Sequence, residues 1–93
     1  MKIDYFLLKE LESYVFSVLN ENNDEVFKFE EFQIKIKKHQ TGEAYICVIA
    51  CGRVNMNFIV DATLIDESMI KESLFADIIC RHLKNILENL EKK

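Results

Sequence analysis

The spacing of the apolar residues changes twice along this 93-residue chain, and that change constrains the fold more than any other feature. Near both ends, apolar residues recur every three or four positions, whereas in the middle they recur at every second position. The first spacing places side chains on one side of a helix, and the second places them on one face of a strand. The chain is therefore predicted to be an α+β protein. With no linker or repeat in view, a single domain over residues 1–93 is expected.

The two helices are predicted from their apolar stripes. Over residues 3–20 the stripe consists of Ile3, Leu7, Leu8, Leu11, Tyr14, Val15, Val18 and Leu19. The polar run 20–24 then ends the helix, because its side chains compete for the backbone in turns. The last third is predicted to be one long helix that begins at Thr63 or Asp66. Its stripe consists of Ile70, Leu74, Phe75, Ile78, Ile79, Leu83, Ile86, Leu87 and Leu90.

Three strands are predicted between the helices, in the order α-β-β-β-α. The first begins at Phe32, the second covers about 43–51, and the third covers 54–60. Residues 39–42 form the first hairpin loop, and Gly52-Arg53 fits a two-residue turn with glycine first. The expected sheet is a three-stranded antiparallel meander with both helices packed on one face. Upstream, Phe27 and Phe29 fall on the opposite parity, which predicts a bulge or turn near 30–31.

The two hairpins also predict which residues lie opposite one another. The Gly52-Arg53 turn pairs Cys51 with Val54, Ile49 with Met56, Cys47 with Phe58 and Tyr45 with Val60. A four-residue loop at 39–42 pairs Ile36 with Tyr45, Ile34 with Cys47 and Phe32 with Ile49. Both registers place the large apolar side chains on one face, so the helices must cover that face.

The other face of the predicted sheet is the candidate binding surface. It carries Gln33, Lys35, Lys37, Ala44, Ile46, Val48, Ala50, Asn55, Asn57, Ile59 and Asp61. Among these, Ile46, Val48 and Ile59 are predicted to anchor a protein partner, with Lys35, Lys37, Asn55 and Asn57 as the polar rim. The alternative interpretation is ordinary, since a central strand is often apolar on both sides.

Composition argues against several classes of function. The longest apolar run is eight residues, Ala44–Cys51, whereas a membrane-spanning helix needs about 20. Neither a membrane span nor a signal peptide is therefore predicted, and the chain is expected to be cytoplasmic. The three cysteines are expected to be free thiols that pack as small hydrophobes. His39 and His82 lack a nucleophile or metal ligands at a recognisable spacing. We therefore expect no catalysis, no metal, no cofactor and no small-molecule substrate.

One basic cluster, formed by Lys35, Lys37, Lys38 and His39, leaves nucleic-acid binding open as an alternative. The net charge of −4 opposes nonspecific binding to nucleic acid. Lysines on an edge strand also discourage aggregation, which explains the cluster without a ligand. Nucleic acid is thus the less favoured partner.

The α-β-β-β-α order, with His39 in the first hairpin loop, resembles the double-stranded RNA-binding domain. That resemblance implies phosphate binding by lysines at the start of the last helix, where this chain instead has the acidic stretch 66–72. The opening helix and three strands are also similar to those of small acidic chaperones of bacterial secretion systems, which dimerise and continue with further strands that this chain lacks. The order itself is similar to that of small phage-encoded inhibitor proteins.

The favoured hypothesis is a non-enzymatic protein-binding module, such as a phage or mobile-element accessory protein that inhibits or escorts a host protein. It would act through the open sheet face or by homodimerisation. A nucleic-acid-binding domain, a structural subunit and a small acidic chaperone are the alternatives.

Overall fold

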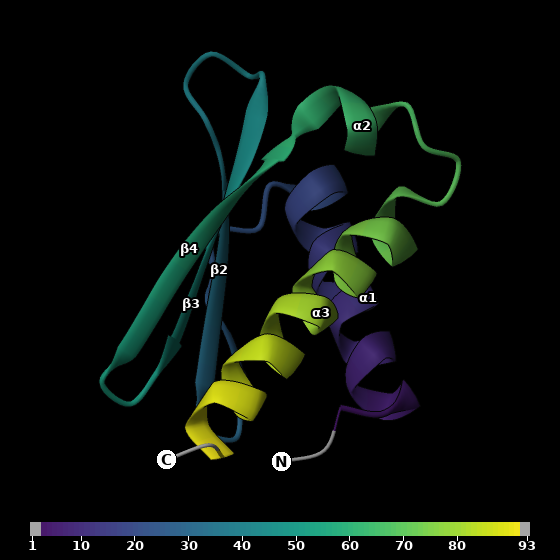
Figure 1. The fold of residues 1–93 in the computed structure, drawn as a ribbon. Helices are drawn as coiled ribbons and strands as arrows, with labels where there is room; N and C mark the ends of the chain where they lie inside the picture. The colour runs from purple at the N-terminus through teal and green to yellow at the C-terminus, as the bar shows by residue number, and fades with distance from the viewer. Residues whose placement is uncertain (1–2, 92–93) are drawn as a thin grey trace.

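The computed structural model describes residues 3–91 and has an α+β fold with a four-stranded antiparallel sheet (Figure 1). The strands lie in the order β1-β2-β3-β4, so each one pairs only with its neighbours in sequence. The elements are α1 (Tyr5–Glu21), β1 (Phe27–Phe29), β2 (Phe32–Lys38), β3 (Ala44–Cys51), β4 (Val54–Asp61), α2 (Ala62–Asp66) and α3 (Lys71–Glu91).

Helix α1 has well-defined ends that match the predicted segment closely. The Asp4 side chain accepts a hydrogen bond from the backbone N–H of Leu7 at 3.0 Å, which caps the first turn. Asn22 follows the last turn in the left-handed conformation, with φ 54°, as expected of a residue in the polar run that ends the helix. Between these caps, Leu7, Leu11, Tyr14 and Val15 are buried.

The prediction of three strands is wrong, because residues 27–29 form a fourth strand at the edge of the sheet. Phe27 pairs with Ile34 and Phe29 with Phe32, so the opposite parity seen in the sequence reflects a hairpin reversal. The turn does fall at Glu30-Glu31, where a turn or bulge is predicted. Glu30 has φ 52°, a conformation that non-glycine residues seldom adopt, so the residue type does not signal this turn.

The register of β3 with β4 is confirmed at all four predicted pairs, from Cys51 opposite Val54 to Tyr45 opposite Val60. The register of β2 with β3 is wrong by two residues: Ile36 lies opposite Cys47 and Ile34 opposite Ile49. The last pair is Lys38 opposite Tyr45, so six residues lie between the paired strands where four were predicted. A shift of two residues preserves the parity of the strand, so every side chain remains on its predicted face.

The single C-terminal helix is also a wrong prediction, because two helices occupy this part of the chain. Asp61 caps α2 by accepting a hydrogen bond from the backbone N–H of Thr63 at 2.8 Å, so Thr63 lies inside the helix. The chain then leaves the helical path, with the Ser68 hydroxyl accepting from the N–H of Ile70. Ile70, which is part of the predicted stripe, is 64% exposed and precedes α3.

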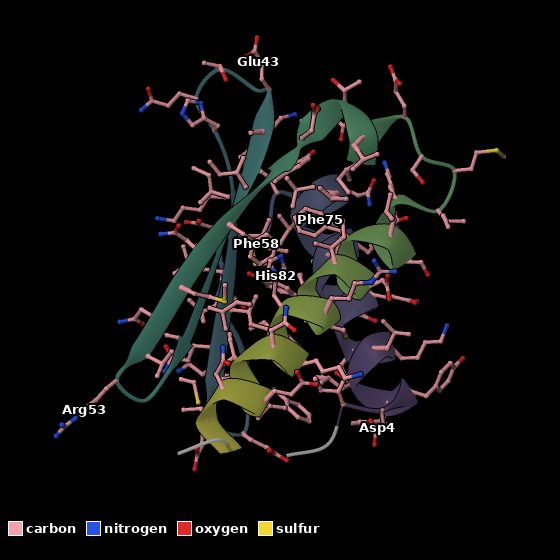
Figure 2. The ribbon with its side chains drawn as sticks, viewed as in Figure 1. Asp4, Glu43, Arg53, Phe58, Phe75 and His82 are labelled. Atoms are coloured by element: carbon pink, nitrogen blue, oxygen red, sulfur yellow. The ribbon has the colours of Figure 1, made fainter. Side chains whose placement is uncertain are left out.

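The core lies between the sheet and the two long helices, α1 and α3, which lie on the same side of it (Figure 1). We call this side of the sheet the covered face. The largest fully buried side chains of the core, from the helices and the sheet together, are Phe75, Leu7, Leu11, Ile34, Ile49, Ile65, Ile79 and Leu83. Phe75 of α3 points toward the sheet (Figure 2), where its ring meets that of Tyr45 edge-on at 5.5 Å. The other side of the sheet is left to form the candidate site.

Candidate functional site

The side of the sheet opposite the helices, here called the open face, is the candidate site. Strand pairing sorts twelve side chains onto it: Lys28, Gln33, Lys35, Lys37, Ala44, Ile46, Val48, Ala50, Asn55, Asn57, Ile59 and Asp61. These include all seven side chains predicted to bind a partner. Their assembly on one surface is a feature of the structure, whereas their role in binding stays a prediction.

Six of the seven side chains fall into two rows across the strands, and the seventh, Asn55, lies in the next row opposite Ala50. One row runs from Lys37 through Ile46 to Ile59, and the next runs from Lys35 through Val48 to Asn57. Adjacent strands in a sheet lie about 4.8 Å apart, so neighbours in each row contact one another. Each row therefore has a basic end on β2 and an aliphatic centre on β3.

The aliphatic side chains of the open face remain partly accessible to solvent. Ile46 and Val48 are half-buried, although they lie on the central strand β3. Ile59 on β4 is 72% exposed, which is high for an isoleucine in a regular strand. The open face thus combines a partly exposed apolar strip with a polar border.

Lys35 is held in place by the loop that follows α1. Its Nζ donates to the backbone carbonyl of Asp24 and lies 2.8 Å from the Asp24 carboxylate. This lysine, through its hydrogen bond and its charge, lowers the pKa of Asp24. The Lys35 side chain is only 17% exposed, so it contributes a positioned charge, whereas Lys37 beside it is exposed.

The charge of the open face is opposite to that of the whole protein. Its strands present Lys28, Lys35 and Lys37, all at the β1-β2 side, against Asp61 at the end of β4 and the Asp24 carboxylate that pairs with Lys35. The protein as a whole has a net charge of −4. The positive charge therefore lies beside the apolar strip, where an acidic and partly apolar ligand would complement both features.

The structure does not bring the proposed nucleic-acid cluster together. Lys38 has the opposite parity from Lys35 and Lys37, and its Nζ lies 5.6 Å from the centre of the Tyr45 ring at the covered face. His39 is held in the hairpin loop, with its Nδ1 3.0 Å from the hydroxyl oxygen of Thr41. Lys35 is also paired with Asp24. Of the four residues in the proposed cluster, only Lys37 is therefore an exposed charge on the open face.

Other reactive side chains lie under or beside the covered face. Burial raises the pKa of the Cys47 thiol to about 12 and that of Cys80 to about 11, which suppresses the thiolate form at neutral pH. The His82 ring stacks on Phe58 at 3.8 Å between centroids (Figure 2), and burial lowers its pKa. Within residues 3–91, no group of three or more His, Cys, Asp or Glu side chains is arranged to hold a metal ion.

Two residues of the site escape the sequence analysis. Lys28 lies on the open face because β1 pairs with β2. Since β1 is not among the predicted strands, Lys28 is not predicted to lie there. Its signal is the alternation Phe27-Lys28-Phe29, which is short but typical of a strand. Asp24 reaches Lys35 from the loop after α1, and nothing in the local sequence indicates that contact.

Comparisons with protein-family models, with curated proteins and with solved structures find no match to this chain. Among the described residues, none of the helices has the length and apolar character that crossing a membrane requires. The case for a function therefore rests on the geometry of the open face.

Proposed function

We propose that this protein is a non-enzymatic binding module that docks another protein on its open face. The observation that carries the proposal is the continuous row Lys37-Ile46-Ile59, in which a highly exposed isoleucine extends the aliphatic strip of the central strand. Aliphatic side chains exposed side by side lose unfavourable contact with water when a partner covers them.

The chemistry of the face favours one kind of partner, an acidic segment with apolar side chains. Its apolar residues would cover Ile46, Val48 and Ile59, and its carboxylates would lie near Lys28 and Lys37. Asn55 and Asn57 supply amide donors and acceptors at the opposite border. This arrangement resembles the apolar centre and polar rim of protein interfaces. An accessory protein or inhibitor that acts on a host protein fits this role.

The proposal is tested by the double variant Ile46→Asp/Val48→Asp. The tagged protein is first used to capture partners from its own host, and the captured protein is then purified and titrated by calorimetry. Because two central apolar contacts would be replaced by desolvated carboxylates, we expect the affinity to fall by about a hundredfold or more. A second variant, Lys37→Glu, should also weaken binding, and the loss of affinity should be larger at low salt than at high salt.

The matched control is Ile70→Asp, which introduces the same charge at another exposed isoleucine outside the sheet. We expect this control to bind the partner as the unmodified protein does. Circular dichroism establishes that each variant retains its fold. If the folded double variant binds the purified partner with unchanged affinity, the open face is not the docking surface.

A further inference from the structure

The two edges of the sheet differ in how well they are protected from pairing with another chain. β1 is three residues long and carries Lys28 at its centre. β4 is eight residues long, contains neither proline nor lysine, and has its only charge at Asp61, the last residue. Short strands and lysines are the usual means of blocking sheet edges, so β4 is the unprotected one.

The outer edge of β4 presents a regular row of backbone donors and acceptors. The residues that flank a two-residue hairpin turn bond to each other, so Val54, Met56, Phe58 and Val60 direct their backbone groups toward β3. The same alternation continues at Ala62, whose N–H donates to the carbonyl of Glu43 at 2.9 Å. The backbone groups of Asn55, Asn57 and Ile59 must therefore point away from the sheet.

We propose that β4 pairs antiparallel with β4 of a second copy of this chain, across a two-fold axis at Asn57. In this register Asn57 lies opposite Asn57 of the second copy, and Asn55 lies opposite Ile59. Opposite residues have the same parity, as sheet geometry requires. Strand addition of this kind satisfies the outward N–H and C=O groups of both copies.

Charge complementarity selects the second copy as the occupant and selects this register. Arg53 lies at the tip of the β3-β4 hairpin and extends away from the body of the molecule (Figure 2), while Asp61 ends β4. With Asn57 on the axis, each Arg53 lies opposite Asp61 of the second copy. The pairing thus forms two symmetric ion pairs, and a shift of two residues in either direction removes both.

The side of β4 toward the helices also favours the pairing. A hollow of about 290 Å³ opens between β4 and the end of α3, lined by Val54, Met56, Ile86, Asn89 and Leu90. In the proposed register, Val60 of the second copy lies opposite Val54, and Phe58 opposite Met56. Val60 is already buried in its own copy, but Phe58 and Met56 are only half-buried, so the pairing brings these two side chains together beside the hollow and reduces their contact with water.

The pairing produces one eight-stranded sheet from two four-stranded ones. Because the two-fold axis is perpendicular to the sheet, both open faces lie on the same side and remain available. This inference does not rest on the proposed function, because the pairing uses the outward backbone groups of β4, whereas docking uses side chains of the open face. An interface made by one pair of strands is small, so the dimer is expected to depend on concentration.

Sedimentation equilibrium from about 1 μM to about 1 mM tests the dimer, with Asn57→Pro as the disrupting variant. Proline removes the outward N–H at the axis in both copies without breaking a bond to β3, so we expect dimerisation to weaken about tenfold or more. The matched control Asn57→Ala retains the backbone N–H and should dimerise within about twofold of the unmodified protein. A monomer throughout the range, or equal dimerisation of both variants, overturns the inference.

A cross-linking experiment tests the register and does not depend on the folding of the proline variant. In a Cys80→Ala background, Asn57→Cys places two thiols opposite each other on the axis, about 5.5 Å apart between Cα atoms, a distance that a disulfide spans. Asn55→Cys is the control, because its counterpart in the second copy is Ile59. Under mild oxidation we expect a disulfide-linked dimer from Asn57→Cys alone. Equal cross-linking of both variants, or none from Asn57→Cys, contradicts the proposed register.

Discussion

Strand β3 contributes apolar side chains to both the covered and the open face of the sheet, but only those on the covered face are buried. Tyr45, Cys47, Ile49 and Cys51 are buried beneath the helices, whereas Ala44, Ile46, Val48 and Ala50 alternate with them and stay half-exposed. The two sets are similar in hydrophobicity, so parity along the strand decides which set stabilises the fold. A substitution on one side of β3 should therefore affect stability, and one on the other side should affect binding.

The largest expected effect comes from neighbouring residues of β3. Ile49→Ala removes a side chain that is 1% exposed, so we expect the free energy of unfolding to fall by about 2–5 kcal/mol. Val48→Ala, on the open face, should cost under about 1 kcal/mol because its side chain already contacts water. Urea unfolding at constant m-value measures both. Similar losses for the two variants would show that the open face is packed as tightly as the covered one.

A smaller effect is expected at Tyr14, which joins α1 to the sheet on the covered face. Its hydroxyl donates to the carbonyl of Glu25 at 2.8 Å and accepts from the N–H of Ile36 at 3.3 Å. Tyr14→Phe leaves both backbone groups without this partner, so we expect a loss of about 1–3 kcal/mol in urea unfolding. Tyr5→Phe, at an exposed tyrosine of the same helix, is the control and should be neutral. A neutral Tyr14→Phe would mean that water replaces the hydroxyl.

On the open face the corresponding polar contact should contribute less. Lys35→Met retains much of the apolar stem but removes the ion pair with the exposed Asp24 carboxylate. We expect the free energy of unfolding to fall by no more than about 1 kcal/mol, and less in 0.5 M salt than in 0.05 M salt (about 4 Å versus about 14 Å screening). A loss as large as that of Tyr14→Phe would contradict the view that polar contacts on this face are weak.

The smallest expected effect is a pH dependence of stability that comes from His82 of α3, whose ring stacks on Phe58 at the covered face of β4. Burial lowers the pKa of this imidazole below its ordinary value of 6.5, so the unfolded chain takes up the proton first. Stability should therefore be intact above pH 6.5 and decline as the pH falls below it. His82→Phe retains a ring against Phe58 and should show a shallower decline between pH 7 and pH 5 in denaturant titrations. An identical pH profile would exclude His82 as the cause.

The sequence predicts the β3-β4 hairpin and the sorting of residues between the two faces because both follow from strong local signals. Gly52, with φ 59°, occupies the first central position of the turn, and alternation along β4 is clear. Alternation has a period of two, however, so it does not detect a shift of two residues. The β2-β3 register therefore depended on the loop after Lys38, whose length the sequence does not specify.

The remaining errors come from elements with weak local signals. β1 has three residues and a turn without glycine, so its strand character depends on pairing with β2. The break between α2 and α3 contains Ser68, whose hydroxyl holds the backbone in a turn, but apolar residues on both sides imitate a continuous stripe. Lys28 was missed because its strand signal covers only three residues, and Asp24 was missed because only a tertiary contact places it beside Lys35.

The meander order of the strands has a consequence for the folding pathway. Each of β1 to β4 pairs with the preceding or following strand, so the sheet forms by closing short loops, which costs little chain entropy. The principal distant contact joins α1 to α3, and the start of the first and the end of the second lie at the same end of the molecule (Figure 1). Docking of these helices closes most of the chain into one loop. Rapid hairpin formation followed by this slower closure is the expected order of events.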